Sequence, residues 1–526
     1  MNRQLRIGVI FQDKVIPAWA YRMLAKIDKS SSSEFVLLIE DNNDQTENNV
    51  NHFVYDLYKK LDRKYFKTKP DALKKKSLDN LINLEAINIR DIESVEKPTI
   101  DIIINLGNNV LNENVSAIAK YGIWRFTFGK NESSTTELNG FWEVIDRKGM
   151  IDVILQMQTQ NVNKILAISP SLTDNLSVNR CQNSFLWKAA SILPRKIEEL
   201  YRVGEIEFFK RVNEIKHHSS TNDIESISSN AKVLLKLAKF KWMRIQNIIK
   251  SFFYFDQWIL LYRFEETTIV SKELSKFKKI LPPKGKFWAD PHVIKKQDTY
   301  YIFIEELIYK ENKGFISVIE MDNQGNYKDP VKILEQDYHL SFPFIIEDND
   351  DIYMIPESKE SKNIQLYKCV NFPYKWELET ILMNNVNAVD TVVTKKDNKY
   401  WLFTNMIEND GASLYDELYL FSSDSLVSND WKSHPENPIV SDVKNARMAG
   451  KLFEQNGNLH RPSQNCSNHY GYGMQINQIT ELTENAYTEK TTKSIFPNWD
   501  KRISSTHSIS HTDNLTVIDA QLKRRK

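Results

Sequence analysis

Residues 1–205 alternate between short apolar runs and amphipathic stretches. The apolar runs cover residues 6–11, 35–40 and 101–106, and continuous runs of this length are typical of strands buried on both faces of a sheet. Between the first two runs, residues 17–29 carry large apolar side chains at helical spacing, namely Trp19, Met23, Leu24 and Ile27. This alternation predicts an α/β domain with a doubly wound parallel sheet over residues 1–205.

From residue 255 onward the pattern predicts strands. Paired strands recur, and the first member of each pair lies at residues 290–294, 342–346, 390–393, 448–453 and 506–510. The fifth unit is too short to form a whole sheet, but residues 257–263 can add a strand to it. Closing a ring in this way removes exposed sheet edges, so the pattern predicts an all-β five-bladed propeller over residues 255–526. A β-sandwich remains the alternative.

Residues 206–254 are predicted to form a helical basic linker between these regions. After a polar break at 217–222, residues 231–250 contain no acidic residue and interleave cations with apolar side chains. The cations are Lys232, Lys236, Lys239, Lys241, Arg244 and Lys250. A helix that lies on a membrane surface has this composition. The alternative is a linker helix that packs its apolar side on a neighbouring domain.

Composition narrows the classes of function. The 526 residues carry 70 Lys and Arg against 69 Asp and Glu, a net charge of +1, so we expect no nucleic-acid partner. Cys181, Cys369 and Cys466 are far apart, which argues against a disulfide framework and a zinc site, and we expect no metal. Because the sequence has no membrane-spanning apolar run and no signal-peptide pattern at residues 1–11, we expect a cytoplasmic protein, peripheral at the inner membrane face if the basic helix binds there.

The first strand of each propeller blade lines the central channel, so residues at equivalent starts should converge there. These residues are Asp290, Pro343, Asp390, Ala449 and His507, while Glu357 ends the second strand of its unit and Glu305 and Glu306 end the equivalent strand of theirs. Glycosidic chemistry needs one acid to protonate a leaving oxygen and a second carboxylate to activate or stabilise the other partner. The sequence therefore predicts Asp290, Glu357 and Asp390 as catalytic residues. The alternative is that the Asp residues only open strands and cap turns.

A polar cluster in the fourth unit is predicted to bind substrate. Arg447 and Arg461 offer planar forks that suit a phosphate or an acidic sugar, and the alternative is an Arg paired with a channel Asp. The predicted substrate-binding set also contains Glu305, Glu306, Gln464, Tyr470 and His507. His507 is a candidate proton donor or a hydrogen-bonded core residue.

Short motifs spread over residues 288–519 carry a family resemblance. They are Ala289-Asp-Pro291, Ile304-Glu-Glu306, Ser341-Phe-Pro-Phe344, Tyr353-Met-Ile-Pro-Glu357, Ala388-Val-Asp390, Asp416-Glu-Leu418, Ala446-Arg447, Arg461-Pro462, Cys466-Ser467, Tyr470-Gly471 and Thr506-His507. The segment resembles the N-terminal domain of plant glucosamine inositolphosphorylceramide transferases, which also occurs in bacterial surface-polysaccharide gene products. The plant enzymes keep their glycosyltransferase domain outside this segment, and we recognise no counterpart of it here.

The predicted propeller is also similar to five-bladed glycosidases of the arabinanase and xylosidase type. Those enzymes carry an Asp-Pro in the first blade, a second Asp and then a catalytic Glu. In this chain the order is Asp290, Glu357, Asp390. The resemblance therefore implies the fold of these enzymes, while the changed order argues against hydrolysis by the same mechanism.

The first domain resembles formyltransferases at residues 121–128, 140–143 and 153–157. In that family an Asn and a His two positions apart act with a later Asp. The matching positions here hold Arg125, Thr127 and Asn161, with Asn163 in place of a Gly. Because Thr and Asn do not titrate near neutral pH, we do not expect formyl transfer, and this domain can still bind a nucleotide-sugar or serve as an assembly platform.

Together these observations predict a glycosyltransferase or related group transferase in surface-polysaccharide or glycoconjugate synthesis, with its site in the propeller channel. Its partner would be a carbohydrate or lipid-linked glycan. No cofactor is expected, and a nucleotide-sugar donor remains open as a substrate. The alternatives are a non-catalytic glycan-binding scaffold and a glycoside hydrolase of the propeller type.

Overall fold

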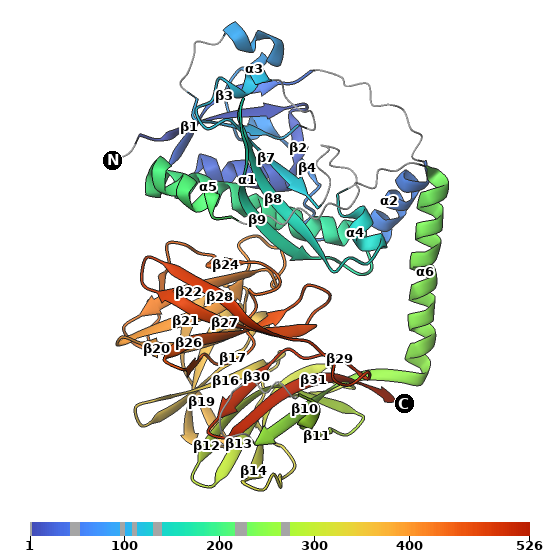
Figure 1. The fold of residues 1–526 in the computed structure, drawn as a ribbon, viewed down its shortest axis with the longest axis vertical. Helices are drawn as coiled ribbons and strands as arrows, with labels where there is room; N and C mark the ends of the chain where they lie inside the picture. The colour runs from blue at the N-terminus through green and yellow to red at the C-terminus, as the bar shows by residue number, and fades with distance from the viewer. Residues whose placement is uncertain are drawn as a thin grey trace. The chain divides into compact units, whose positions relative to one another are not determined.

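The computed structural model describes residues 3–42, 53–94, 100–107, 113–129, 139–215, 229–264 and 274–526. The chain divides into two compact units (Figure 1). Unit 1 comprises Met1–Met243 together with Glu408–Ser413, and unit 2 comprises Arg244–Ile407 and Leu414–Lys526. The polar break at 217–222 lies outside the described residues.

A seven-stranded sheet forms the centre of unit 1, in the order β5-β3-β1-β6-β7-β8-β9. The strands are β1 (Leu5–Phe11), β3 (Ser33–Glu40), β5 (Ala86–Asn88), β6 (Ile102–Asn105), β7 (Ile123–Phe128), β8 (Met150–Gln158) and β9 (Asn163–Leu172). The first five run parallel to one another, whereas β8 pairs antiparallel with both β7 and β9. The prediction of a parallel sheet is therefore wrong for these two pairings. A tight turn held by Thr159 and Val162 joins β8 to β9, and strands joined so closely can only be antiparallel.

Apolar side chains cover both faces of this sheet. On β1, Ile7, Val9 and Phe11 enter one core, and Ile10 enters a second core on the other face, as the alternation of side chains along a strand requires. The first core contains α1 (Ala18–Asp28) and most of α5 (Val178–Asn213). The remaining elements of unit 1 are β2 (Val15–Pro17), α2 (Phe53–Tyr65), β4 (Lys75–Ser77), η1 (Leu78–Asn80), η2 (Ile89–Ser94), α3 (Glu113–Ser116) and α4 (Phe141–Ile145).

The basic segment forms one helix, α6 (Asn230–Phe253), as the sequence predicts. Three of its residues, Val233, Leu237 and Phe240, are buried in the first core of unit 1. The linker alternative is therefore correct for this stripe of the helix. Among the described residues, no helix has both the length and the apolar character needed to cross a membrane.

Unit 2 is a five-bladed β-propeller, as predicted (Figure 1). Three blades follow the chain in order: β12 (Lys286–Lys296), β13 (Thr299–Ile308), β14 (Lys313–Asp322) and β15 (Val331–Leu334); β16 (Ser341–Asp348), β17 (Asp351–Glu357), β18 (Asn363–Asn371) and β19 (Lys375–Asn384); and β20 (Ala388–Lys396), β21 (Lys399–Met406), β22 (Glu417–Ser423), β23 (Lys432–Ser433) and β24 (Val440–Ser441). The fourth contains β25 (Phe453–Gln455), β26 (Asn458–Asn465), β27 (Gly473–Leu482) and β28 (Tyr487–Ile495). Short 3-10 helices lie at η4 (Leu274–Lys276) and η5 (Lys359–Ser361).

The fifth blade joins the two ends of unit 2. It combines β10 (Tyr254–Phe264) and β11 (Lys278–Ile280) with β29 (Ile503–Ser505), β30 (Ile509–Thr512) and β31 (Leu515–Arg525). β10 pairs with β31 along its whole length, from Tyr254 opposite Arg525 to Phe264 opposite Leu515. The predicted closure is confirmed, although β10 brings β11 with it rather than adding a single strand.

A β-bulge recurs where the inner strands of the first three blades begin. The backbone of Asp290, Phe342 and Asp390 has φ of 50°, 42° and 50°, and the pairing register shifts at each place. Phe342, not the predicted Pro343, is thus the equivalent of the two Asp residues. In the fourth blade the expected strand at 448–453 shrinks to β25 and a bridge from Met448 to Ser463. Bulges redirect side chains, and this one sets the direction of Asp290 and Asp390.

Candidate active site

Arg447 connects two of the three predicted catalytic carboxyl groups. Its Nε lies 2.5 Å from Oδ2 of Asp390, and its Nη2 lies 3.7 Å from Oε2 of Glu357. Gln464 also donates to Oδ2 of Asp390 at 2.9 Å. The negative charge of Asp390 also acts on Glu357 and helps to raise its pKa. The structure therefore brings together Glu357, Asp390, Arg447 and Gln464, from three different blades.

Two tyrosines hold the Arg447 guanidinium. Its central carbon lies 5.0 Å from the ring centroid of Tyr415 and 4.9 Å from that of Tyr470. A guanidinium over an aromatic face gains electrostatic energy that grows when water is excluded. These contacts and the Asp390 pair fix the side chain of Arg447 from three sides. Arg447 is thus paired with a channel Asp, which is the alternative left open by the sequence, and its role in substrate binding stays a prediction.

A second cluster surrounds Asp290. The Nδ1 of His507 lies 2.6 Å from Oδ2 of Asp519, and its Nε2 lies 3.5 Å from Oδ1 of Asp290. The imidazole stacks on Trp258, with ring centroids 4.2 Å apart. Burial opposes its charge, but the Asp519 carboxylate outweighs burial and raises the pKa of His507 to about 9. His507 is therefore an imidazolium at neutral pH.

Ser508 reveals where a proton sits in this cluster. Its Oγ lies 2.7 Å from Oδ1 of Asp290 and 2.7 Å from Oδ2 of Asp519. A hydroxyl has only one hydrogen to donate, so one of the two carboxyl groups must supply the hydrogen of the other contact. His507 holds the pKa of Asp519 below its usual value against the effect of burial, which makes Asp290 the protonated partner.

Burial is the main reason that the pKa values of Asp290 and Glu357 are raised. It raises the pKa of Asp290 to about 7, with Glu305 and Asp519 adding to the rise and His507 opposing it. It also raises the pKa of Glu357 well above its usual value, supported by the charge of Asp390. Glu357 keeps 13% of its side-chain surface exposed, against 7% for Asp290 and 3% for Asp390. Burial and Asp390 thus favour the protonated form of Glu357 by raising its pKa, and Glu357 is the most accessible of the three.

Asp290, His507 and Asp519 also form the cluster of described residues whose ligand atoms could reach one metal ion, since they lie within 4.8 Å of one another. A metal needs the neutral imidazole as its ligand, and the ion pair with Asp519 favours the charged form of His507 by raising its pKa. The expectation of no metal stays a prediction, and the groups present fit an internal ion pair better than a metal site.

Three other predicted residues have partners of their own. Glu305 receives Nε2 of His339 at 3.1 Å, and Glu306 binds Nζ of Lys286 at 2.6 Å and Oγ of Ser317 at 2.7 Å. Arg461 is fully buried and pairs with Glu489 through two nitrogens at 2.9 and 2.6 Å. The guanidinium of Arg461 thus has its directional bonds filled by the protein, and we do not carry it into the proposed site.

Sequence reasoning missed four residues of the site: Trp258, Tyr415, Ser508 and Asp519. Asp519 lies on β31, and Tyr415 lies in the connection between β21 and β22. A usable signal was available for Asp519. An acid inside the apolar run 515–522 is costly to bury unless it has a partner, and His507 is the partner.

Unit 1 contains a separate cavity of about 370 Å³ at the carboxyl ends of its parallel strands. Gln12 follows β1 and Leu106 follows β6, and both line it. Because β1 lies between β3 and β6, the strand order reverses here, which is where open α/β sheets bind ligands.

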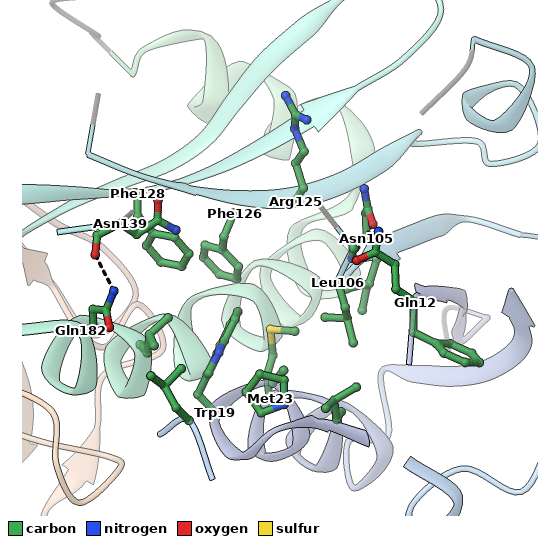
Figure 2. Close-up of a pocket in the computed structure, with 18 of the residues that line it drawn as sticks. Gln12, Trp19, Met23, Asn105, Leu106, Arg125, Phe126, Phe128, Asn139 and Gln182 are labelled. Atoms are coloured by element: carbon green, nitrogen blue, oxygen red, sulfur yellow. Dashed lines mark hydrogen bonds between the residues drawn. The ribbon is translucent and has the colours of Figure 1, made fainter. Parts of the chain in front are cut away.

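The walls of this cavity are mainly apolar. Figure 2 shows Trp19, Met23 and Phe126 facing a common space, and the rings of Trp19 and Phe126 meet edge to face at 6.0 Å. Arg125 points away from these side chains (Figure 2), as does Thr127 by the alternation along β7. Gln182 closes one polar end by donating to the backbone oxygen of Asn139 at 2.8 Å. The likeness of unit 1 to formyltransferases stays a prediction.

Comparison with known sequences finds one family over much of unit 2. Residues 278–517 match the family described as glucosamine inositolphosphorylceramide transferase 1, N-terminal. The chain is 34% identical over 206 residues to glucosamine inositolphosphorylceramide transferase 1 of Oryza sativa subsp. japonica and to that of Arabidopsis thaliana. The match covers 39% of this chain and 27% of each relative. The chain therefore matches about a quarter of the length of these curated relatives.

Solved structures with low similarity include glycoside hydrolases. One is Zg3597, a family 117 glycoside hydrolase of the marine bacterium Zobellia galactanivorans, at 10% identity and a TM-score of 0.34, covering 51% of this chain and 90% of that one. Another is an exo-1,5-α-L-arabinanase from a bovine ruminal metagenomic library, at 14% identity and a TM-score of 0.32, covering 45% and 92%.

Proposed function

We propose that unit 2 is the catalytic module of a glycosyl- or related group transferase in glycoconjugate synthesis. The observation that carries the proposal is the pair of buried carboxyl groups with raised pKa values, Glu357 beside the Arg447–Asp390 pair and Asp290 beside His507. Enzymes tune a carboxyl group toward neutral pH when it must give or take a proton. Strongly shifted carboxyl groups that lie near one another are concentrated at functional sites.

The two carboxyl groups suit complementary roles. Glu357 would donate its proton to the leaving oxygen as the bond from sugar to donor breaks. Asp290 would accept the proton of the acceptor hydroxyl as that oxygen bonds to the same carbon. Arg447, beside Glu357, would stabilise negative charge on the leaving group or on a phosphate of the substrate. His507 and Ser508 would orient Asp290, since both contact its Oδ1.

The relatives suggest the class of substrate. They are named for glucosamine, a sugar, and for inositolphosphorylceramide, a phosphorylated lipid. We therefore propose a sugar as the transferred group and a lipid-linked or phosphorylated glycan as the acceptor.

The first prediction concerns Asp290. Asp290→Asn is expected to lower product formation at least tenfold. This loss should be smaller than the loss caused by removing an acid catalyst, because an acceptor hydroxyl can lose its proton late when the transition state is oxocarbenium-like. The assay would supply UDP-glucosamine or UDP-N-acetylglucosamine with inositolphosphorylceramide and detect product by mass spectrometry. The matched control is Asp351→Asn, which should keep full activity. Asp351 lies on β17 and pairs with Lys368.

Two other results would replace this proposal. Release of free sugar without transfer would favour a hydrolase. Glycan binding that is equal in the wild type and Asp290→Asn, with no product from either, would favour a non-catalytic scaffold.

The cavity of unit 1 supports a second candidate function, binding of a nucleotide-sugar donor. The aromatic wall formed by Trp19 and Phe126 suits a planar base, and the cations Lys59, Arg63 and Lys75 outnumber Asp13 along the lining. Such a donor would be a substrate and not a resident cofactor.

Fluorescence titration tests this second function. Uridine diphosphate is expected to quench the emission of Trp19 saturably, and Phe126→Ala should weaken binding roughly ten- to hundredfold, the range that base–aromatic stacking provides. Phe209→Ala removes a ring that packs on Tyr121 and Phe208, outside the cavity lining, and should leave affinity unchanged. Equal losses in both variants would show a general effect on unit 1 and exclude this aromatic wall as the binding site.

A further inference from the structure

Helix α6 has an apolar face that the described residues leave uncovered. Its exposed apolar side chains recur every three or four residues, and each is between 47% and 72% exposed: Leu234, Leu235, Trp242, Ile245, Ile248, Ile249, Phe252 and Phe253. The buried stripe of Val233, Leu237 and Phe240 lies on a different side of the helix. α6 therefore has enough apolar surface for two partners, and the core of unit 1 takes only one stripe.

Lysines accompany the exposed face. At 3.6 residues per turn, Lys239 and Lys250 fall along one edge of it, and Lys241 falls near the other edge, between Ile248 and Leu234. All three are exposed, and α6 contains no acidic residue. A broad apolar strip with Lys at its borders is the arrangement of helices that lie in the interface of an anionic bilayer.

The positive charge continues beyond the end of α6. Tyr254, the first residue of β10, pairs with Arg525, and the backbone nitrogen of Lys526 donates to the oxygen of Phe253 at 3.1 Å. Lys523, Arg525 and Lys526 are exposed. The apolar end of the helix, at Phe252 and Phe253, is thus flanked by a second group of cations in unit 2.

A shallow recess lies at the same place. It measures about 510 Å³ and is lined by Phe255, Asp256, Lys284, Tyr309 and Lys526. Aromatic rings with a polar edge concentrate where protein meets lipid headgroups, and Tyr309 is itself 37% exposed. The recess offers two ammonium groups to a phosphate beside an aromatic wall.

We propose that the exposed face of α6 binds the surface of an anionic lipid bilayer, with its apolar side chains at the acyl boundary and the bordering lysines on lipid phosphates. Charge complementarity favours lipid over a second copy of this chain, because a copy would bring the same cations to the contact. The inference goes beyond the transfer chemistry, since binding would hold the chain near lipid-linked acceptors without any change at the channel site.

Vesicle sedimentation with the full chain tests the proposal. We expect binding to vesicles that mix phosphatidylserine with phosphatidylcholine, and much weaker binding to phosphatidylcholine alone. The variant Lys239→Gln, Lys241→Gln, Lys250→Gln should bind the mixed vesicles about a hundredfold more weakly, roughly fivefold for each cation. Replacing Trp242, Ile249 and Phe252 with Ser should abolish binding, and because these side chains are exposed the variant should melt like the wild type.

A charge-matched control separates this surface from net charge. Lys328→Gln, Lys375→Gln and Lys490→Gln remove three exposed lysines of the propeller blades and should leave vesicle binding unchanged. Equal binding of wild type and Ser variant to mixed vesicles would overturn the proposal. The proposal would also be overturned if the wild type failed to bind the mixed vesicles and sedimentation velocity showed self-association that the Ser variant loses. A second copy of the chain would then cover the face. A failed transfer reaction would leave the vesicle result unaffected.

Discussion

Replacing Glu357 with Gln is expected to lower the rate of transfer by about 10²–10⁴-fold, the range that a positioned proton donor contributes. Gln keeps the shape of the side chain but has no acidic proton to give. The change should cost little stability, because burial and Asp390 raise the pKa of Glu357 and so disfavour its charged form, and Gln carries no charge. Steady-state kinetics and urea unfolding of the same preparation measure the two effects.

The pH dependence of the rate identifies which group loses its role. Asp290, with a pKa of about 7, accepts a proton only when ionised, so activity should fall as pH drops below about 7. Glu357 must stay protonated, so activity should also fall at high pH, above the raised pKa of this group. Glu357→Gln should lose the alkaline limb and keep the acid limb.

Asp351→Asn is the control for this variant, since it changes another acid of β17 without reaching the channel cluster. A rate for Glu357→Gln within about threefold of wild type, with the alkaline limb retained, would contradict the role of Glu357 as the acid.

The repeat made the propeller predictable from the sequence. Each inner strand starts with a recognisable motif, and the fifth unit lacks strands that residues 257–263 can supply. The pairing of β10 with β31 follows from this, because a blade with an unpaired edge would be unstable. Asp290 and Asp390 were found for the same reason, since equivalent positions in a ring converge on its axis. The sheet of unit 1 was predicted less well, since buried apolar runs do not reveal strand direction and β8 pairs antiparallel with both β7 and β9.

The sequence does not show which polar residues lie at the candidate site and which form buried ion pairs elsewhere. Arg447 and Arg461 look alike there, yet one lies between two tyrosines beside Glu357 and the other is fully buried on Glu489. The difference comes from side-chain direction. Arg461 lies on β26, where a shift of one position moves a side chain to the opposite face of the sheet. Pairing across blades, such as His507 with Asp290, depends on distances that only the folded ring sets.

The last prediction separates these two arginines. Arg461→Met is expected to lower the free energy of unfolding of unit 2 by about 3–5 kcal/mol, the cost of leaving a buried charge without its partner. Glu489 would keep only the hydroxyl of Tyr487, and the backbone oxygen of Asn445 would lose its donor. In the double variant with Glu489→Gln no uncompensated charge remains, so unfolding by urea should show less destabilisation than Arg461→Met alone. Below the unfolding transition, Arg461→Met should keep the wild-type KM. A raised KM in a folded variant, with no coupling to Glu489, would restore Arg461 to the substrate-binding set.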